Sequence, residues 1–122
     1  MTGLEFRIIR RFNRISQTEL ADQISRSRFT IASFERDEFV PPVAVKALSN
    51  SIGIDLSDPK IFLDCLRSVP RKYFEAECPR HTYAMFNEHQ AEFDKWMKSI
   101  QEANPGDKLY SPDFGISFMF PH

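Results

Sequence analysis

The chain from residue 15 to residue 36 has the sequence ISQTELADQISRSRFTIASFER, in which two short helical patterns flank a polar connection. Ser16 and Glu19 have the S-x-x-E spacing of a capping box, the motif that closes the first turn of a helix with two reciprocal hydrogen bonds. Leu20, Ala21 and Ile24 then recur at helical intervals as an apolar face. This pattern predicts a short helix that ends abruptly near Ile24.

A second short helix is predicted after the connection Ser25-Arg26. Ser27 stands at its N-cap, because a serine side chain can accept a hydrogen bond from the first free N–H groups of a helix. Ile31 and Phe34 have the spacing of residues on one helical face and are expected to point inward. The two helices are therefore expected to pack against each other through a tight connection.

Three further helices are predicted within residues 1–69, because each start and stop is marked by a residue with a physical reason to be there. The markers are Thr2 with Glu5 as a capping box, Pro41-Pro42 and Pro59 at first helical positions, Ser57 or Asp58 as an N-cap, and Gly53 and Pro70 as stops. The apolar faces are Phe6, Ile9 and Phe12, then Val45, Leu48 and Ile52, then Ile61, Phe62, Cys65 and Leu66. We therefore expect five helices and a domain boundary after residue 69.

Residues 70–122 differ from the first part because aromatic residues are denser there. Phe86, Phe93, Trp96, Met97 and Ile100 fall at helical intervals and predict one long amphipathic helix over residues 82–102. The sequence Asn-Pro-Gly-Asp at 104–107 predicts a turn. Residues 114–120 favour a terminal strand, for which residues 71–76 are the expected pairing partner. The expected fold class is mainly α, with a small aromatic-rich α(+β) segment at the C-terminal end.

The composition is that of a compact globular protein, with 122 residues, 42% of them hydrophobic and 27% charged, and a net charge of -1. No apolar run approaches the roughly 18 residues of a membrane span, and the first residues lack the apolar core of a signal peptide. We expect a cytoplasmic protein without a membrane partner. Cys65 and Cys78 are expected to stay reduced as half-buried apolar side chains rather than to form a disulfide.

Positive charge is gathered toward the N-terminal end of the chain. The arginines concerned are Arg7, Arg10, Arg11 and Arg14 in the first predicted helix, and Arg26, Arg28 and Arg36 in the segment that follows. Because lysine and arginine supply much of the affinity for nucleic-acid phosphates, this distribution matters more than the net charge. The alternative is that these arginines only solvate helix faces, as most charge runs do.

The motif residues form three groups, Ile15 to Ala21, Ser27 to Ile31 and Phe34 to Arg36, followed by Pro41, Leu48 and Ile54. With these residues the chain resembles the Cro/CI repressor family, also called the XRE or lambda-repressor-like family, of helix-turn-helix DNA-binding domains. The resemblance covers residues 3–56 and has no gap across the first three helices. It implies a five-helix DNA-binding domain over residues 1–69, in which small Ala21 lets two helices cross closely and the helix after Ser27 enters the major groove.

The resemblance also implies a set of DNA-binding residues, namely Gln17, Arg26, Ser27, Arg28, Phe29, Thr30, Ser33 and Arg36. Gln17 would meet a phosphate, and Arg28 would read a guanine through paired hydrogen bonds to O6 and N7, the alternative for Arg28 being a phosphate contact. Phe29 would meet a thymine methyl group or cover the helix pair. Arg36 would position the domain on the duplex rather than specify a base.

Arg10 and Glu35 occupy family positions that commonly form a structural ion pair. Two other residues depart from the family pattern, which often has glycine at both places: Ser25 lies between the two helices and Asp37 follows the second one. A non-glycine residue in the left-handed conformation costs on the order of 1 kcal/mol. These departures bear on the loop geometry rather than on the fold.

The function implied by the resemblance is that of a sequence-specific transcriptional regulator, a dimeric repressor that reads a palindromic operator. One helix-turn-helix makes few contacts, so two copies are expected to read half-sites about one helical turn apart. The residues expected at the homodimer interface are Phe93, Trp96, Met97, Ile116 and Phe118. The alternatives are that these residues complete a monomeric core or line a pocket for an apolar effector.

Another functional class remains open, the antitoxin of a toxin-antitoxin pair, which would bind DNA with its first half and a toxin with its aromatic second half. An enzyme is not expected, because only four glycines are present, no phosphate-binding loop is found, and no motif suggests a nucleophile. No cofactor is expected. No metal site is expected either, since Cys78, His81 and His89 have ligand-like spacing but the other half of a zinc pattern is missing.

Overall fold

The structure is a computed structural model that describes residues 1–77 and 83–112, with side chains described for residues 1–77 and 90–112. The chain divides into two compact units, Met1–Val69 and Pro70–His122. The described residues are mainly helical and contain seven helices and no strand.

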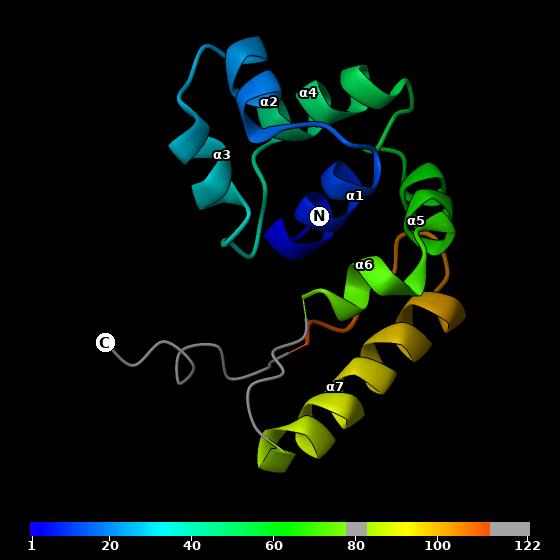
Figure 1. Cartoon of the computed structure of the whole chain (residues 1–122). Coiled ribbons are helices and arrows are strands. Elements are labelled where there is room, and N and C mark those ends of the chain that lie inside the picture. Colours follow the sequence, from blue (N-terminus) through cyan, green and yellow to red (C-terminus); the bar gives the residue numbers. More distant parts are fainter. Residues whose placement is uncertain (78–82, 113–122) are drawn as a thin grey trace. The chain divides into compact units, whose positions relative to one another are not determined.

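The first unit consists of five helices, as the sequence predicts (Figure 1). They are α1 (Gly3–Phe12), α2 (Gln17–Gln23), α3 (Arg28–Phe34), α4 (Pro42–Ile52) and α5 (Pro59–Ser68). α2 packs against both α3 and α4, whereas α1 packs against α5. The short helix α3 is thus held on one side by α2, which fixes its orientation within this unit.

Local hydrogen bonds fix the starts of these helices. Both predicted capping boxes are present, at Thr2 before α1 and at Ser16 before α2. Asp58, rather than Ser57, caps α5, because its Oδ1 accepts hydrogen bonds from the backbone N–H groups of Lys60 (2.9 Å) and Ile61 (3.2 Å). These caps satisfy N–H groups that have no partner inside the helix.

Ser27 occupies the N-cap of α3, but its side chain makes no capping hydrogen bond there. Its hydroxyl lies 3.4 Å from the hydroxyl of Thr30 instead. The predicted position of Ser27 is therefore confirmed, whereas the bond expected from it is absent. α3 is fixed by packing and not by a cap at its start.

α1 and α2 end in the same type of tight turn, and each turn contains one residue in the left-handed conformation. At the end of α1, Arg14 has φ 58°, its N–H donates to the carbonyl of Arg11 (3.1 Å), and the N–H of Ile15 donates to the carbonyl of Arg10 (3.2 Å). These two bonds define a Schellman motif, in which the last free carbonyls of a helix are satisfied. Ile15 is buried beneath the turn.

The end of α2 repeats this motif with Ser25 at φ 55°. Its N–H donates to the carbonyl of Asp22 (3.3 Å), and the N–H of Arg26 donates to the carbonyl of Ala21 (2.9 Å). α4 ends in a left-handed residue as well, but there the residue is Gly53, at φ 78°. The left-handed conformation costs an L-residue roughly 1–2 kcal/mol and costs glycine almost nothing, so α2 carries strain at both of its flanks.

The left-handed conformation that glycine would favour after α3 is not adopted by Asp37. Among the described residues, the non-glycine residues with positive φ are Arg14 and Ser25. Instead, the carbonyl of Asp37 accepts a hydrogen bond from the N–H of Gly3 (2.9 Å), and a side chain at Gly3 would lie 2.7 Å from the carbonyl oxygen of Glu35. The start of α1 therefore holds the end of α3 closely, and this contact replaces a glycine turn.

The core of the first unit is built largely from the predicted apolar faces, but Ile8 and Ala44 are buried without having been predicted, and Phe12, Val45 and Ile52 are only half-buried. The side chains that are fully buried are Phe6, Ile8, Ile9, Leu20, Ile31, Ala44, Leu48 and Leu66. The prediction is wrong in α5, where Ile61 is 37% exposed and Leu63 is buried in its place. The apolar face of α5 is therefore turned by part of a helical turn relative to the spacing that the sequence suggests.

In the second unit the predicted first strand is wrong. Residues 71–75 form the helix α6 (Arg71–Glu75), and Pro70 stands at its N-cap. The helical conformation brings Arg71 and Glu75, one turn apart, within 2.8 Å of each other, and Phe74 is buried. The predicted terminal strand at 114–120 lies outside the described residues.

The second helix of this unit, α7 (Tyr83–Glu102), agrees with the helix predicted over residues 82–102. It buries Phe93, Trp96 and Ile100. Trp96 makes edge-to-face contacts with two rings, with centroids 5.1 Å away for Phe74 and 6.2 Å away for Phe93. Such edge-to-face pairs add to the burial of apolar area, so these three rings form the centre of the unit's core.

The predicted turn after α7 is also confirmed. The N–H of Asp107 donates to the carbonyl of Asn104 (3.0 Å), and Gly106 has φ 90°. The chain then returns along α7, since the N–H of Tyr110 donates to Ser99 Oγ (2.8 Å) and the Tyr110 hydroxyl lies 2.6 Å from a carboxylate oxygen of Glu92. In the part of the chain that the structure describes, no helix is both long enough and apolar enough to cross a membrane.

Candidate functional site

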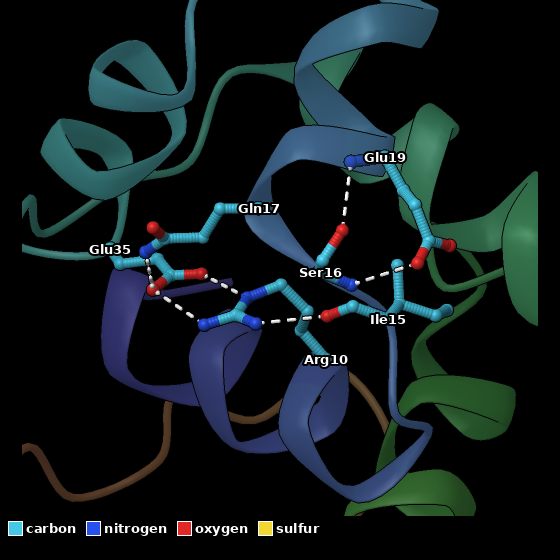
Figure 2. Close-up of polar contacts among 6 residues, drawn as sticks. All are labelled: Arg10, Ile15, Ser16, Gln17, Glu19 and Glu35. Atoms are coloured by element: carbon cyan, nitrogen blue, oxygen red, sulfur yellow. Dashed lines mark hydrogen bonds and ion pairs between the residues drawn. The ribbon is translucent and has the colours of Figure 1, made fainter.

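A buried polar network joins the end of α1, the start of α2 and the end of α3 (Figure 2). The guanidinium of Arg10 donates from Nε to Glu35 Oε2 (2.5 Å) and from Nη2 to Glu35 Oε1 (3.1 Å). Its Nη1 donates to the carbonyl of Ile15 (2.9 Å), and Gln17 Nε2 donates to Glu35 Oε1 (3.0 Å). One carboxylate therefore fixes three backbone segments relative to one another.

Arg10 and Glu35 are thus brought together as the resemblance implies. Their side chains are only 10% and 2% exposed, and the two bonds between them have the bidentate geometry of strong arginine–carboxylate pairs. Removing one partner of a buried pair leaves an uncompensated charge and costs about 3–5 kcal/mol. The pair is therefore structural, and its role is to hold α3 against α1 and α2.

The outer side of α3 presents a compact set of exposed side chains. Ile31 is completely buried, whereas Arg28, Phe29 and Ser33 are exposed and Thr30 is half-buried. Phe29 is 71% exposed, and the guanidinium carbon of Arg28 lies 5.2 Å from the centre of its ring. The exposed ring and the guanidinium beside it offer an apolar and a cationic contact on one helix face, so the face is a candidate binding surface.

The charge around this face is positive. Residues 1–36 contain seven arginines and four acidic residues, a formal charge of +3, which the exposed Asp37 and Glu38 directly after them reduce to +1. Arg14, Arg26, Arg28 and Arg36 are all exposed, and none of the four forms an ion pair with a carboxylate within residues 1–77 and 90–112. α3 also has no acidic residue in its first turn. This region is therefore able to attract an anionic partner.

Gln17 lies at the start of α2, where the resemblance places a phosphate contact. Its side-chain amide carries two N–H groups, of which one is recorded as donating to Glu35. Gln17 is half-buried, so its side chain also reaches the surface. The bond to Glu35 holds the amide in place before any ligand arrives. No sequence signal predicts this bond, because it depends on where the end of α3 lies relative to α2.

Two of the residues expected at a dimer interface lie instead in the core of the second unit. Phe93 is 2% and Trp96 is 1% exposed, and both contribute to the core with Phe74. Met97 is half-buried, while Ile116 and Phe118 lie outside the described residues. The burial of Phe93 and Trp96 favours the alternative that these residues complete the unit's own core.

Of the two cysteines and three histidines of the chain, only Cys65 has a described side chain. Cys65 is a free thiol, and its burial raises the pKa of the thiol, so it is less nucleophilic at neutral pH than an ordinary cysteine. Cys78 and His81 lie outside the described residues, as does the side chain of His89. Among the side chains that are described, no three His, Cys, Asp or Glu residues are grouped so as to hold a metal ion.

No protein-family model, no curated protein and no solved structure matches this chain. A functional assignment therefore has to rest on the residues themselves and on their geometry.

Proposed function

We propose that this chain binds double-stranded DNA in a sequence-specific manner and regulates transcription, with α3 as the helix that reads the bases. The observation that carries the proposal is the outer side of α3, where Arg28 and Phe29 are exposed together on a helix whose inner side is buried through Ile31. Phe29 is 71% exposed beside the guanidinium of Arg28, so both side chains are accessible to a ligand.

The dimensions of α3 suit a major groove. A helix with its side chains is about 10–12 Å wide, and the groove is about 12 Å wide. Arg28 is the first residue of α3, and the first residues of a recognition helix are those that contact base edges. In this arrangement Arg28 would pair with a guanine, and Phe29 would pack on a thymine methyl group.

The residues around α3 would hold the duplex backbone. Arg26 and Arg36 are exposed cations that flank α3 in the sequence, and Gln17 is held by Glu35 near the end of the same helix. Contacts of these side chains to phosphates fix the register of a protein on DNA without reading the sequence. The division of roles is therefore Arg28 and Phe29 for bases, and the other three for backbone.

Two copies on a palindromic operator remain part of this proposal, because one such helix contacts only a few base pairs. The interface between the copies would have to use residues other than Phe93 and Trp96, since both are buried in their own unit. Repression is the expected outcome where the operator overlaps a promoter.

The test is the binding of Arg28→Ala to DNA. Duplexes are first enriched on the wild-type protein from a random pool and from the DNA flanking its gene, and the best duplex and a scrambled version are then titrated. We expect the variant to lose affinity for the selected duplex by on the order of ten- to a hundredfold, because a bidentate arginine–guanine contact contributes about 1–3 kcal/mol of discrimination. Its affinity for the scrambled duplex should change far less.

Lys60→Ala is the matched control. Lys60 is an exposed cation of the same unit, on α5. It lies 3.8 Å from Asp64, and a surface ion pair of this kind contributes little to stability. This variant should bind both duplexes like the wild type. Equal loss of affinity in Arg28→Ala for every duplex would reduce Arg28 to a phosphate contact, and failure of the wild type to enrich any sequence would refute the proposal.

A further inference from the structure

Three helices of the first unit end in a residue with the left-handed conformation, and Arg14 is the one among them with a long charged side chain. At the end of α4 the residue is Gly53, for which this conformation is free of strain. At the ends of α1 and α2 the residues are Arg14 and Ser25, at φ 58° and 55°. A long charged side chain is therefore kept at a position where glycine would be more stable.

The fold itself gives no reason for the side chain of Arg14. It is exposed, and no hydrogen bond or ion pair of this side chain is found within residues 1–77 and 90–112. The apolar anchor of the turn is the next residue, Ile15, which is buried. Strained backbone that persists without a structural benefit points to function.

The buried network places Arg14 close to two other groups of the candidate site. A single guanidinium, that of Arg10, contacts both the carbonyl of Ile15, next to Arg14, and the carboxylate of Glu35, next to Arg36 (Figure 2). The same carboxylate holds Gln17, which lies three residues after Arg14, at most about 11 Å along an extended chain. Two exposed cations and an amide are therefore gathered around one rigid network.

We propose that Arg14 is a further phosphate-binding residue and that it acts on the duplex backbone together with Gln17 and Arg36. The inference rests on the proposed function, because it assigns the anion to DNA. The turn around Arg14 is fixed by the two backbone bonds of the Schellman motif and by the bond from Arg10 to Ile15. A cation on a rigid turn loses less conformational freedom on binding than one on a mobile loop.

The test compares four variants of the full chain, Arg14→Gly, Arg14→Lys, Ser25→Gly and Arg36→Ala, by titration with a random-sequence 20-base-pair duplex at several KCl concentrations. Each phosphate contact of a cation contributes about 0.9 to the slope of log K against log salt concentration. We expect Arg14→Gly to lower this slope by about 0.9 and to weaken binding several-fold at low salt, whereas Arg14→Lys should keep the slope. Ser25→Gly relieves the same kind of backbone strain without a change of charge, so it should also keep the wild-type slope.

Thermal unfolding of the same variants keeps a folding defect apart from a binding defect. Arg14→Gly and Ser25→Gly should melt at or above the wild-type temperature, because glycine prefers the left-handed conformation. If Arg14→Gly keeps the wild-type slope while Arg36→Ala lowers it, the role of Arg14 is refuted and the proposed function stands. If the wild type shows no salt-dependent binding to any duplex, the proposed function fails and the role of Arg14 fails with it.

Discussion

Both units of this chain have an apolar core, but the other interactions that support the core differ. In Met1–Val69, hydrogen bonds between nearby residues fix the helix ends, and the Arg10–Glu35 pair locks three segments together. In Pro70–His122, the described core depends on the rings of Phe74, Phe93 and Trp96. The first unit therefore forms a rigid frame for exposed side chains, whereas the largest side chains described in the second unit are buried in its core.

This difference separates the residues that are free to bind a partner from those that are not. On α3 the aromatic residue Phe29 is 71% exposed, whereas on α7 Phe93 and Trp96 are almost fully buried. Aromatic residues in a sequence therefore do not identify a binding surface by themselves. The arrangement of the partners that bury them decides which of them remain accessible.

The largest effect is expected from Phe74→Ala in the second unit. Deleting a buried phenylalanine costs about 3–5 kcal/mol, and Phe74 also loses its edge-to-face contact with Trp96. Trp96 is the single tryptophan of the chain, so its fluorescence reports directly on this unit during denaturant unfolding. The variant should shift the fluorescence transition to much lower denaturant concentration.

Lys95→Ala is the control, because Lys95 is exposed on α7, the helix that carries Trp96. This variant should leave the fluorescence transition in place. A Phe74→Ala protein with a wild-type fluorescence transition would show that the three rings are not the core of the second unit.

A smaller effect is expected at the helix starts of the first unit, where two serines provide a matched pair. Ser16 caps α2 with a hydrogen bond to the N–H of Glu19 (3.0 Å), whereas Ser27 makes no such bond to α3. Ser16→Ala should therefore cost about 1 kcal/mol. Ser27→Ala should cost only a few tenths of that amount.

Native-state hydrogen exchange of the amides in α2 and α3 measures both values. Equal destabilisation by the two substitutions would mean that the capping hydrogen bond of Ser16 contributes no stability.

The helix starts could be predicted from the sequence because both partners of a capping box lie within three residues of each other. The helix α6 could not, because Tyr73 and Phe74 favour strands locally and the contact that decides the conformation is with Trp96, far along the chain. Local propensity is a weak guide wherever a distant residue supplies the packing. The same reason explains why Ile61, rather than Leu63, was predicted to be buried in α5.

For the candidate site, the charged and aromatic residues of α3 could be chosen from the sequence, and so could Arg10 and Glu35. The bond between Gln17 and Glu35 and the left-handed conformation of Arg14 could not be predicted. Both depend on how the ends of α1 and α3 meet the start of α2, which is a property of the packed unit. For Phe93 and Trp96 the sequence left two alternatives open, a dimer interface and a monomeric core, because the spacing of apolar residues does not show what covers them.

The most direct test of the central claim is a two-dimensional amide NMR spectrum of the labelled full chain, recorded during titration with the selected duplex. We expect the largest shifts at Arg14, at Gln17 and at Arg28 to Ser33, with far smaller shifts for the amides of residues 90–112. The largest shifts at residues 90–112, or equal shifts with the scrambled duplex, would contradict the claim that the outer side of α3 reads DNA.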